Sequence, residues 1–223
     1  MQIKPDEIAA SIRRDLASLS QHDVPSIRKV RRQYSASLKT AAPKSLLKIV
    51  RRLLLGGAWP ERLIAFELLA GDKLAFELVD DKTVEEMARG LSDWGSVDLF
   101  GVTILGQAWR AGLVTDRKIH SWARSNDRWK RRLALVATVP LNLKSRGGVG
   151  DTRRTLAVCI LLLDDRDDMV VKALSWALRQ LVMTDPVSAK DFLKTNADRL
   201  APRVKREVLN KLTTGKKYPK GKP

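Results

Sequence analysis

Residues 170–182 read Val-Val-Lys-Ala-Leu-Ser-Trp-Ala-Leu-Arg-Gln-Leu-Val. The large apolar side chains recur with the 3.6-residue period of an α-helix, so they fall on one face, at positions 170, 171, 174, 178, 181 and 182. Stripes of the same kind recur along the chain, whereas strand-like alternation is almost absent. The sequence therefore predicts an all-α protein, with further helices around 6–19, 43–55, 59–70, 82–92, 95–109, 115–125, 128–139, 152–163, 186–195 and 199–213.

The spacing of three unusual positions predicts a repeat architecture. Asp98 and Arg132 are 34 residues apart, and Arg132 and Trp176 are 44 apart across an extra glycine-rich loop at 144–151. A step of roughly 35–45 residues is typical of HEAT-like repeats. We therefore expect a HEAT-like repeat superhelix, an α-solenoid of stacked antiparallel helix pairs whose equivalent helices line a basic concave groove. This single domain is expected to span 1–213 and to be followed by a basic disordered tail at 214–223.

The charge balance points to a polyanionic partner. Lysine and arginine number 42 against 25 aspartates and glutamates, which gives a net charge of +17. The basic residues are spread along the whole chain, and no stretch approaches the roughly 20 apolar residues that a membrane-spanning helix needs. Nucleic acid is therefore favoured over a membrane surface.

Several kinds of site are not expected. The only cysteine, Cys159, lies in an apolar run and is interpreted as a buried small hydrophobe, so no disulfide forms and a reducing compartment is favoured. His22 and His120 have no metal-ligand spacing, and Gly-Gly-Val-Gly at 147–150 lacks the Lys-Ser/Thr of a phosphate-binding loop. We expect neither metal nor cofactor, and a cytoplasmic, nucleoid-associated location.

The helix expected around Trp176 carries an aromatic residue on its polar face. Lys172, Trp176, Arg179 and Met183 lie opposite the apolar stripe. Cations that meet phosphates and a ring that meets a sugar or base are typical of nucleic-acid surfaces. The alternative is that Trp176 packs against a neighbouring repeat.

A second unusual pair is Trp94 and Asp98, which are one helical turn apart and share a face. Asp93 is expected to cap the start of this helix. Asp98 lies among apolar neighbours, where a carboxylate is costly to bury without a partner. It is therefore either a working carboxylate or a structural aspartate held by an ion pair.

The third segment is basic. Arg128 and Arg132 share a helix face, and Arg131 lies next to them. A basic helix face of this kind is usually solvated or binds phosphate. Trp129 could equally lie in the core or at the surface.

These three segments resemble the DNA alkylation repair family of HEAT-like DNA glycosylases of the AlkD type. The resemblance runs from Trp59-Pro-Glu-Arg to Thr184-Asp185-Pro186, and more weakly to the end of the chain. It consists of a Trp four residues before an Asp, a Trp-x-Arg-Arg segment, and a Lys-Ala-x-x-Trp-x-Leu-Arg helix followed by Thr-Asp-Pro. These motifs are Trp94 with Asp98, residues 129–132, and residues 172–179 with 184–186.

The resemblance implies a site as well as a fold. Asp98 takes the part of the catalytic carboxylate, Trp94 and Trp176 flank it, and Arg132 faces the DNA. It also implies that the lesion is read from the backbone side, without a base-flipping pocket. Basic side chains of equivalent helices would hold phosphates without base specificity, namely Arg62, Arg128, Arg131, Arg132, Arg154, Lys172 and Arg179.

A single carboxylate limits the chemistry. Glycoside hydrolysis usually needs two carboxylates, one of which protonates the leaving group. A purine alkylated at N3 or N7 is already cationic and departs as a neutral base, so electrostatic stabilisation by one aspartate suffices. The sequence therefore predicts a monofunctional glycosylase that excises 3-methyladenine or 7-methylguanine in base excision repair.

Two other functions compete with this prediction. One is a HEAT-like protein that binds DNA structures without catalysis, and the other is a helical scaffold for an acidic protein. The joint presence of Trp94, Asp98, Arg132 and Trp176 favours the enzyme, while the aromatic residues on polar faces argue against the scaffold. We expect a monomer whose partner is double-stranded DNA that contains alkylated bases.

Overall fold

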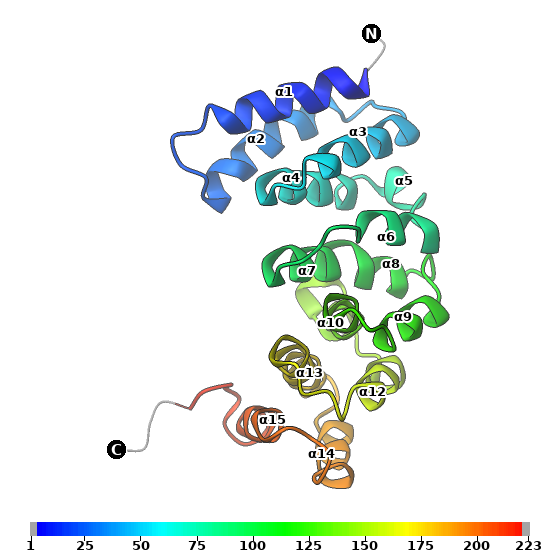
Figure 1. Ribbon diagram of the computed structural model, residues 1–223, viewed down its shortest axis with the longest axis vertical. Helices are drawn as coiled ribbons and strands as arrows, with labels where there is room; N and C mark the ends of the chain where they lie inside the picture. Colours follow the sequence, from blue (N-terminus) through cyan, green and yellow to red (C-terminus); the bar gives the residue numbers. More distant parts are fainter. Residues whose placement is uncertain (1–3, 220–223) are drawn as a thin grey trace. The chain divides into compact units, whose positions relative to one another are not determined.

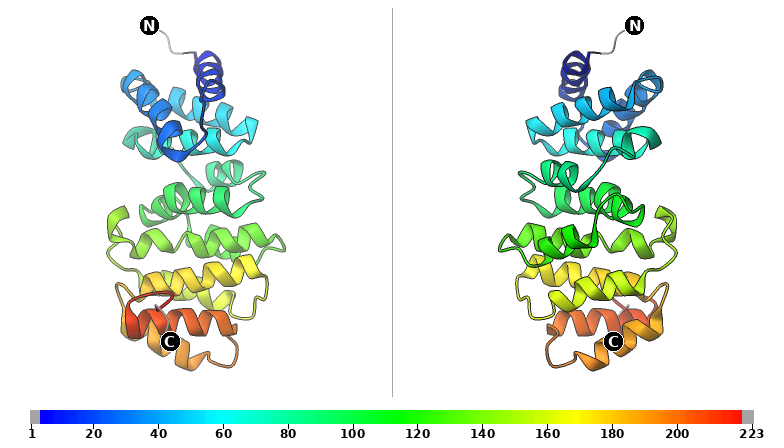
Figure 2. Two further views of the ribbon diagram at one scale, coloured as in Figure 1. Left: turned by 90° about the vertical axis from the view of Figure 1, so that its left-hand side faces the viewer. Right: turned by 90° about the vertical axis from the view of Figure 1, so that its right-hand side faces the viewer.

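The computed structural model describes residues 4–219, and within this range the chain is helical and has no strand. Successive helices pack against one another in stacked layers, as Figure 1 and Figure 2 show for each part of the chain. The predicted all-α solenoid class is therefore confirmed. No helix of the described residues is long and apolar enough to cross a membrane.

The chain divides into two compact units, the first of which ends at Ile104. In this unit α1 packs on α3, α2 on α4, and α4 on α7. Phe66 of α4 and Phe100 of α7 lie in the core with ring centroids 5.1 Å apart. A π-helical turn (Gly101–Leu105) follows α7. The helices are α1 (Pro5–Ala17), α2 (Val24–Ser37), α3 (Pro43–Gly56), α4 (Trp59–Ala70), α5 (Lys73–Phe76), α6 (Asp81–Met87) and α7 (Trp94–Phe100).

The second unit begins at Leu105. Its layers follow the same pattern, because α13 packs on both α10 and α15, while α12 packs on α9. A short 3₁₀ turn (Lys144–Arg146) lies between α11 and α12. The helices are α8 (Gly106–Arg110), α9 (Asp116–Ala123), α10 (Arg128–Val136), α11 (Val139–Asn142), α12 (Thr152–Leu161), α13 (Asp168–Leu181), α14 (Pro186–Thr195) and α15 (Pro202–Thr214).

Several ion pairs between neighbouring helices join residues 34 or 35 positions apart, although others have a larger separation, up to 48 for Arg13 and Glu61. Arg51 pairs with Glu86 in the first unit, 35 residues away. In the second unit Arg131 pairs with Asp165, 34 residues away, and Arg203 pairs with a residue 35 positions earlier, Asp168. A constant separation is expected where equivalent helices stack. The separation of 34 or 35 residues lies at the lower end of the predicted repeat length. The assignment of these repeats to the HEAT type stays a prediction.

Most of the described helices begin with a side-chain cap, which explains why turn residues located their starts in the sequence. The capping oxygen accepts a hydrogen bond from a backbone N–H of the first turn, which otherwise has no partner in the helix. The capping residues are Asp23, Asp72, Asp80, Asp93, Thr115, Asp127, Asp151, Asp167 and Asp185.

The glycine-rich loop at 144–151 is folded tightly onto the end of α11. The amide of Gly148 donates to the carbonyl of Leu143 (3.1 Å), and that of Gly150 donates to the carbonyl of Leu141 (3.0 Å). A Cβ atom at Gly148 would lie 2.3 Å from the carbonyl oxygen of Pro140. The loop is therefore a packed element of the second unit, and its close approach requires a glycine at 148.

We expect Gly148→Ala to lower the free energy of unfolding by about 1–3 kcal/mol, because the added methyl overlaps rigid backbone. Urea denaturation of the full chain measures the loss. Val149→Ala is the matched control, because Val149 is exposed at the same loop and should change stability little. Equal stabilities of the two variants would contradict the packing role of Gly148.

The structure describes the predicted tail at 214–223 as far as residue 219. Thr214 ends α15, and residues 215–219 turn back onto this helix. The carbonyl of Lys217 accepts from Asn210 Nδ2 (3.1 Å), and the hydroxyl of Tyr218 donates to Glu207 (3.3 Å). The disorder expected of this tail stays a prediction, and 220–223 lie outside the described residues.

Cys159 lies on α12 and is completely buried. Burial raises the pKa of its thiol, so the reactive thiolate is not populated near neutral pH. The interpretation of Cys159 as a small core hydrophobe is confirmed.

Candidate nucleic-acid interface

Helix α7 presents the predicted tryptophan and aspartate at the surface of the first unit. Asp93 caps the helix, since its carboxylate accepts from the amide of Ser96 (2.8 Å), which confirms the predicted cap. Trp94 is the first helical residue and is 63% exposed, while Asp98 is half-buried one turn later. Residues four apart on a helix share a face, so the indole and the carboxylate are neighbours. Tryptophan is enriched at binding interfaces because its ring offers a large apolar surface and its N–H can form a hydrogen bond.

Arg62 of α4 holds the start of α7 in place. It is 8% exposed, and its guanidinium donates to the hydroxyl of Ser96 (2.9 Å) and to the carbonyl of Gly90 (2.8 Å). The carboxylate of Asp93 lies 3.6 Å from the same guanidinium. The structure therefore gives Arg62 a positioning role within the protein, and its predicted contact with phosphate stays a prediction.

Replacing Arg62 by methionine should lower the free energy of unfolding by about 2 kcal/mol, because a buried hydroxyl and a carbonyl lose a charged donor. Chemical denaturation measures the loss. The control is Arg32→Met, at an exposed arginine of the same unit, which should stay within about 0.5 kcal/mol of wild type. If Arg62→Met loses no more stability than the control, the hydrogen bonds around Ser96 do not contribute to the free energy of unfolding.

Three predicted arginines of α10 differ sharply in exposure. Arg128 is 54% exposed, lies 3.6 Å from Asp167 and stacks over the ring of Trp129 at 5.0 Å. Arg131 donates to Asp165 (2.6 Å) and to two backbone carbonyls that precede α10. Arg132 is 6% exposed and donates to the carbonyl of Met169 at the start of α13. Arg128 is therefore the one of the three that is presented to solvent, while Arg131 and Arg132 tie α10 to the next layer.

The polar face of α13 has the predicted composition. Trp176 is half-buried, and Lys172 is 42% exposed and pairs with Asp168 (2.6 Å). The Lys172 ammonium, which donates to Asp168, lowers the pKa of that carboxyl. Arg179 is mostly buried and donates to the hydroxyl of Ser175 (3.2 Å). The opposite face lies in the core, as predicted, through Val170, Val171, Leu174, Leu178 and Leu181.

Arg154 lies among other groups of the second unit. Its guanidinium is 3.1 Å from Asp116, stacks over the ring of Trp109 at 5.3 Å and donates to the Trp109 carbonyl (3.3 Å). Trp109 in turn donates its indole N–H to Asp116 (2.7 Å). Arg154 therefore joins α12 to α8 and α9, and nothing brings it to the polar faces of α10 and α13.

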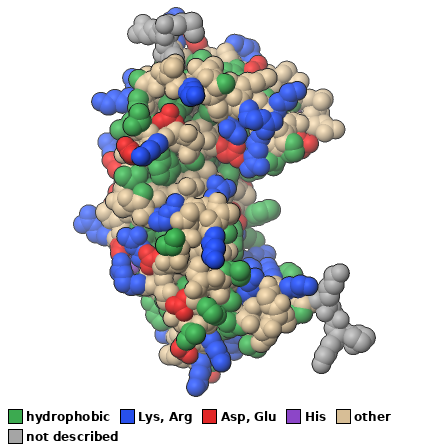
Figure 3. Space-filling model, turned by 180° about the vertical axis from the view of Figure 1, so that it is seen from behind, with side chains coloured by type: hydrophobic (Ala, Val, Ile, Leu, Met, Phe, Trp, Pro, Cys, Tyr) green, Lys and Arg blue, Asp and Glu red, His purple; other side chains and the backbone are tan. Residues whose placement is uncertain are grey.

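Basic side chains are scattered over the surface of both units, as Figure 3 shows for one face. The described residues thus combine an all-helical stack, an exposed indole beside a carboxylate, and basic helix faces. The sequence model of the family described as DNA alkylation repair enzyme matches residues 21–212. The chain belongs to this family. It therefore has a role in the repair of alkylation damage, and its family implies a DNA substrate.

The match to the repair family stands alone among the comparisons. No curated protein and no solved structure matches the chain. The family model begins at residue 21 and so includes α2, a segment that the resemblance of motifs did not cover. It supports the enzyme role, whereas the parts assigned to Asp98, Trp94 and Trp176 stay predictions.

Sequence reasoning missed a buried carboxylate in this repair enzyme. Glu207 of α15 is 2% exposed, and one of its oxygens accepts from the hydroxyl of Ser175 (2.6 Å) on α13. Lys217 lies 3.5 Å away, and Arg179 and Arg203 lie 3.8 and 3.9 Å away. The signal was present, because Glu207 is three residues after Val204 and so shares the buried face of α15. Glu207 fixes the helix that carries Trp176.

Proposed function

We propose that this protein is a monofunctional DNA glycosylase that excises N3- or N7-alkylated purines from duplex DNA, the first step of base excision repair. The exposed Trp94, one turn before the half-buried Asp98, carries the proposal. The resemblance to glycosylases of the AlkD type implies in addition that the lesion is read from the backbone side, without a base-flipping pocket. Membership in the repair family supports the same substrate.

In the proposed reaction the bond between C1′ of the sugar and the alkylated purine breaks first. The electron pair of that bond goes to the cationic base, which leaves neutral and needs no general acid. The sugar becomes an oxocarbenium ion, which the carboxylate of Asp98 stabilises by its negative charge. Asp98 also orients a water molecule that adds to C1′ and accepts the proton that this water loses.

The two tryptophans assist the reaction through the π faces of their indole rings. An indole attracts a cation above its ring, by about 1–2 kcal/mol when water is excluded. Trp94 is placed for this on α7, beside Asp98. We assign the same part to Trp176, which lies on the polar face of α13 between Lys172 and Arg179.

The phosphate contacts that the structure supports best are Arg128 and Lys172, because both side chains are well exposed on helices that also carry a tryptophan. The remaining predicted contacts donate hydrogen bonds within the protein, so they would act by holding helices of their own unit in place. They are Arg62, Arg131, Arg132, Arg154 and Arg179.

The direct test is base release. Methylated duplex DNA is incubated with the purified protein, and free 3-methyladenine and 7-methylguanine are measured by chromatography. Release above the spontaneous rate supports the glycosylase. Tight binding to DNA without release would instead support the non-catalytic DNA-binding alternative.

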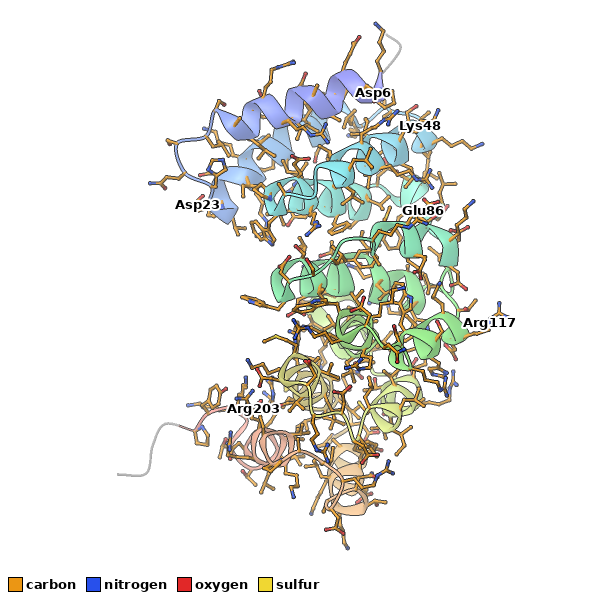
Figure 4. All side chains as sticks on the ribbon, in the orientation of Figure 1. Asp6, Asp23, Lys48, Glu86, Arg117 and Arg203 are labelled. Atoms are coloured by element: carbon orange, nitrogen blue, oxygen red, sulfur yellow. The ribbon has the colours of Figure 1, made fainter. Side chains whose placement is uncertain are left out.

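Duplex binding should weaken at least about tenfold between about 50 and 200 mM salt, because phosphate contacts release counterions. The variants Arg128→Ala and Lys172→Ala should each reduce the slope of log K against log salt by about 1. Arg117→Ala, at an exposed arginine of α9 (Figure 4), is the matched control and should leave the slope unchanged. Unchanged slopes in all three variants would remove α10 and α13 from the binding surface.

A further inference from the structure

The first unit contains a pocket whose lining includes none of Trp94, Asp98 and Trp176, although Arg62, which holds the start of α7, belongs to its wall. Its volume is about 820 Å³, and it lies between the start of α1, the outer face of α3 and the residues that end α6. Asp6, Lys48 and Glu86, labelled in Figure 4, all belong to its wall. The volume is within the range of roughly 300–1,000 Å³ that is typical of ligand sites.

The wall of this pocket is strongly basic. Five basic side chains and two carboxylates line it among the described residues. Arg51 and Arg52 are paired with Glu86 (3.0 Å) and Asp6 (2.7 Å), but both pairs are exposed and so contribute little and exchange readily. Lys48 and Arg89 are exposed, and within residues 4–219 neither has an ion pair within 4 Å. The pocket therefore attracts an anion.

The pocket also offers an apolar surface beside these cations. Leu54, Leu55 and Met87 line it, and Leu55 is 75% exposed. An aliphatic group that covers Leu55 would gain about 25 cal/mol per Å² of apolar surface buried. The occupant that fits carries both negative charge and an aliphatic side chain.

Single-stranded nucleic acid fits less well. Proteins bind unpaired bases by stacking them on aromatic rings. Among the described residues that line the pocket, none is aromatic. A phosphate backbone would satisfy the cations but would leave Leu55 uncovered.

We propose that this pocket binds an acidic peptide segment of a partner protein, with aspartate or glutamate side chains on Lys48 and Arg89 and a leucine or isoleucine on Leu55. The peptide would recruit the protein to other proteins at the DNA. Arg62 belongs both to the pocket wall and to the contacts that hold α7, but peptide binding is measured without base release, so either proposal can fail without the other.

The probe is a fluorescein-labelled peptide with the sequence Asp-Asp-Asp-Leu-Asp-Asp-Leu, and its binding to the full chain is followed by fluorescence anisotropy. Two matched peptides replace either every aspartate by asparagine or both leucines by serine. We expect the acidic peptide to bind and each matched peptide to bind at least about tenfold more weakly. The variant Lys48→Glu/Arg89→Glu should weaken binding by at least about tenfold, and Leu55→Ser by about threefold to tenfold.

The control variant is Lys39→Glu, which reverses an exposed charge of the same unit outside the pocket and should keep the affinity. All substituted side chains are exposed, so the variants should fold, which their free energies of unfolding will show. No binding to wild type, equal binding by the pocket and control variants, or equal binding of the serine peptide would each overturn the proposal. Displacement of the peptide by a thymidine oligonucleotide that loses affinity in the pocket variant would assign the pocket to nucleic acid instead.

Discussion

Replacing Asp98 by asparagine should reduce the release of 3-methyladenine and 7-methylguanine by about 100- to 1,000-fold, because a single preorganised electrostatic contact to a transition state has about this effect. Asparagine keeps the shape of the side chain but not its negative charge. The sugar cation then loses its counter-charge, and the attacking water loses its proton acceptor. Single-turnover release from methylated duplex DNA measures the change, and duplex affinity should stay within about threefold of wild type.

The matched control is Glu77→Gln, which removes an exposed carboxylate of the first unit that lies outside α7. It should retain full activity. If Asp98→Asn is as active as this control, Asp98 is a structural aspartate, even if the protein is a glycosylase. If wild type itself releases no base, the proposed function is wrong, whatever the variants show.

The sequence located α13 well because two independent signals agree there. The apolar stripe at 170–182 has a clean helical period, and Asp167 caps the observed helix (Asp168–Leu181) by accepting from the amide of Met169. Both signals are local, so they can be read without knowing what the helix packs against.

Helix α2 (Val24–Ser37) was missed for the opposite reason. Only Ile27 and Val30 of this basic helix are buried, which is too few for a recognisable stripe. Arg28 and Arg31 instead pair with Glu67 of α4, at 2.7 and 3.3 Å. A helix held in part by charges on another helix leaves little local pattern, so the sequence alone cannot place it.

Exposure of the arginines could not be predicted from spacing either. Arg128 and Arg132 are four residues apart and share a helix face, yet their side chains differ in environment. The start of α13 covers Arg132 through the carbonyl of Met169, whereas Arg128, the first residue of α10, is exposed. Local periodicity gives the face of a helix, but packing between layers decides which part of that face meets solvent.

The largest loss in the free energy of unfolding, about 3–5 kcal/mol, is expected from Glu207→Ala. This substitution removes a buried negative charge and leaves the groups that contact it without a partner. The hydroxyl of Ser175 is fully buried and would lose its acceptor. Burial lowers the pKa of Arg179, whose guanidinium lies 3.8 Å from Glu207, so the cation is already costly to hold there. Urea denaturation of the full chain measures the loss, and hydrogen exchange of α13 and α15 locates it.

Asp164→Ala is the matched control, because Asp164 also pairs with an arginine about one repeat away, Arg199, but at the surface. Exposed pairs contribute less than about 1 kcal/mol, so this variant should unfold almost as wild type does. The loss of stability in Glu207→Gln should lie between those of Glu207→Ala and Asp164→Ala. The amide oxygen can still accept the hydrogen bond from Ser175, but the amide cannot balance the positive charge of Arg179. If Glu207→Ala and Asp164→Ala lose equal stability, the buried carboxylate does not join α13 to α15. If exchange instead speeds up only in these two helices, Glu207 positions Trp176 as the proposed function requires.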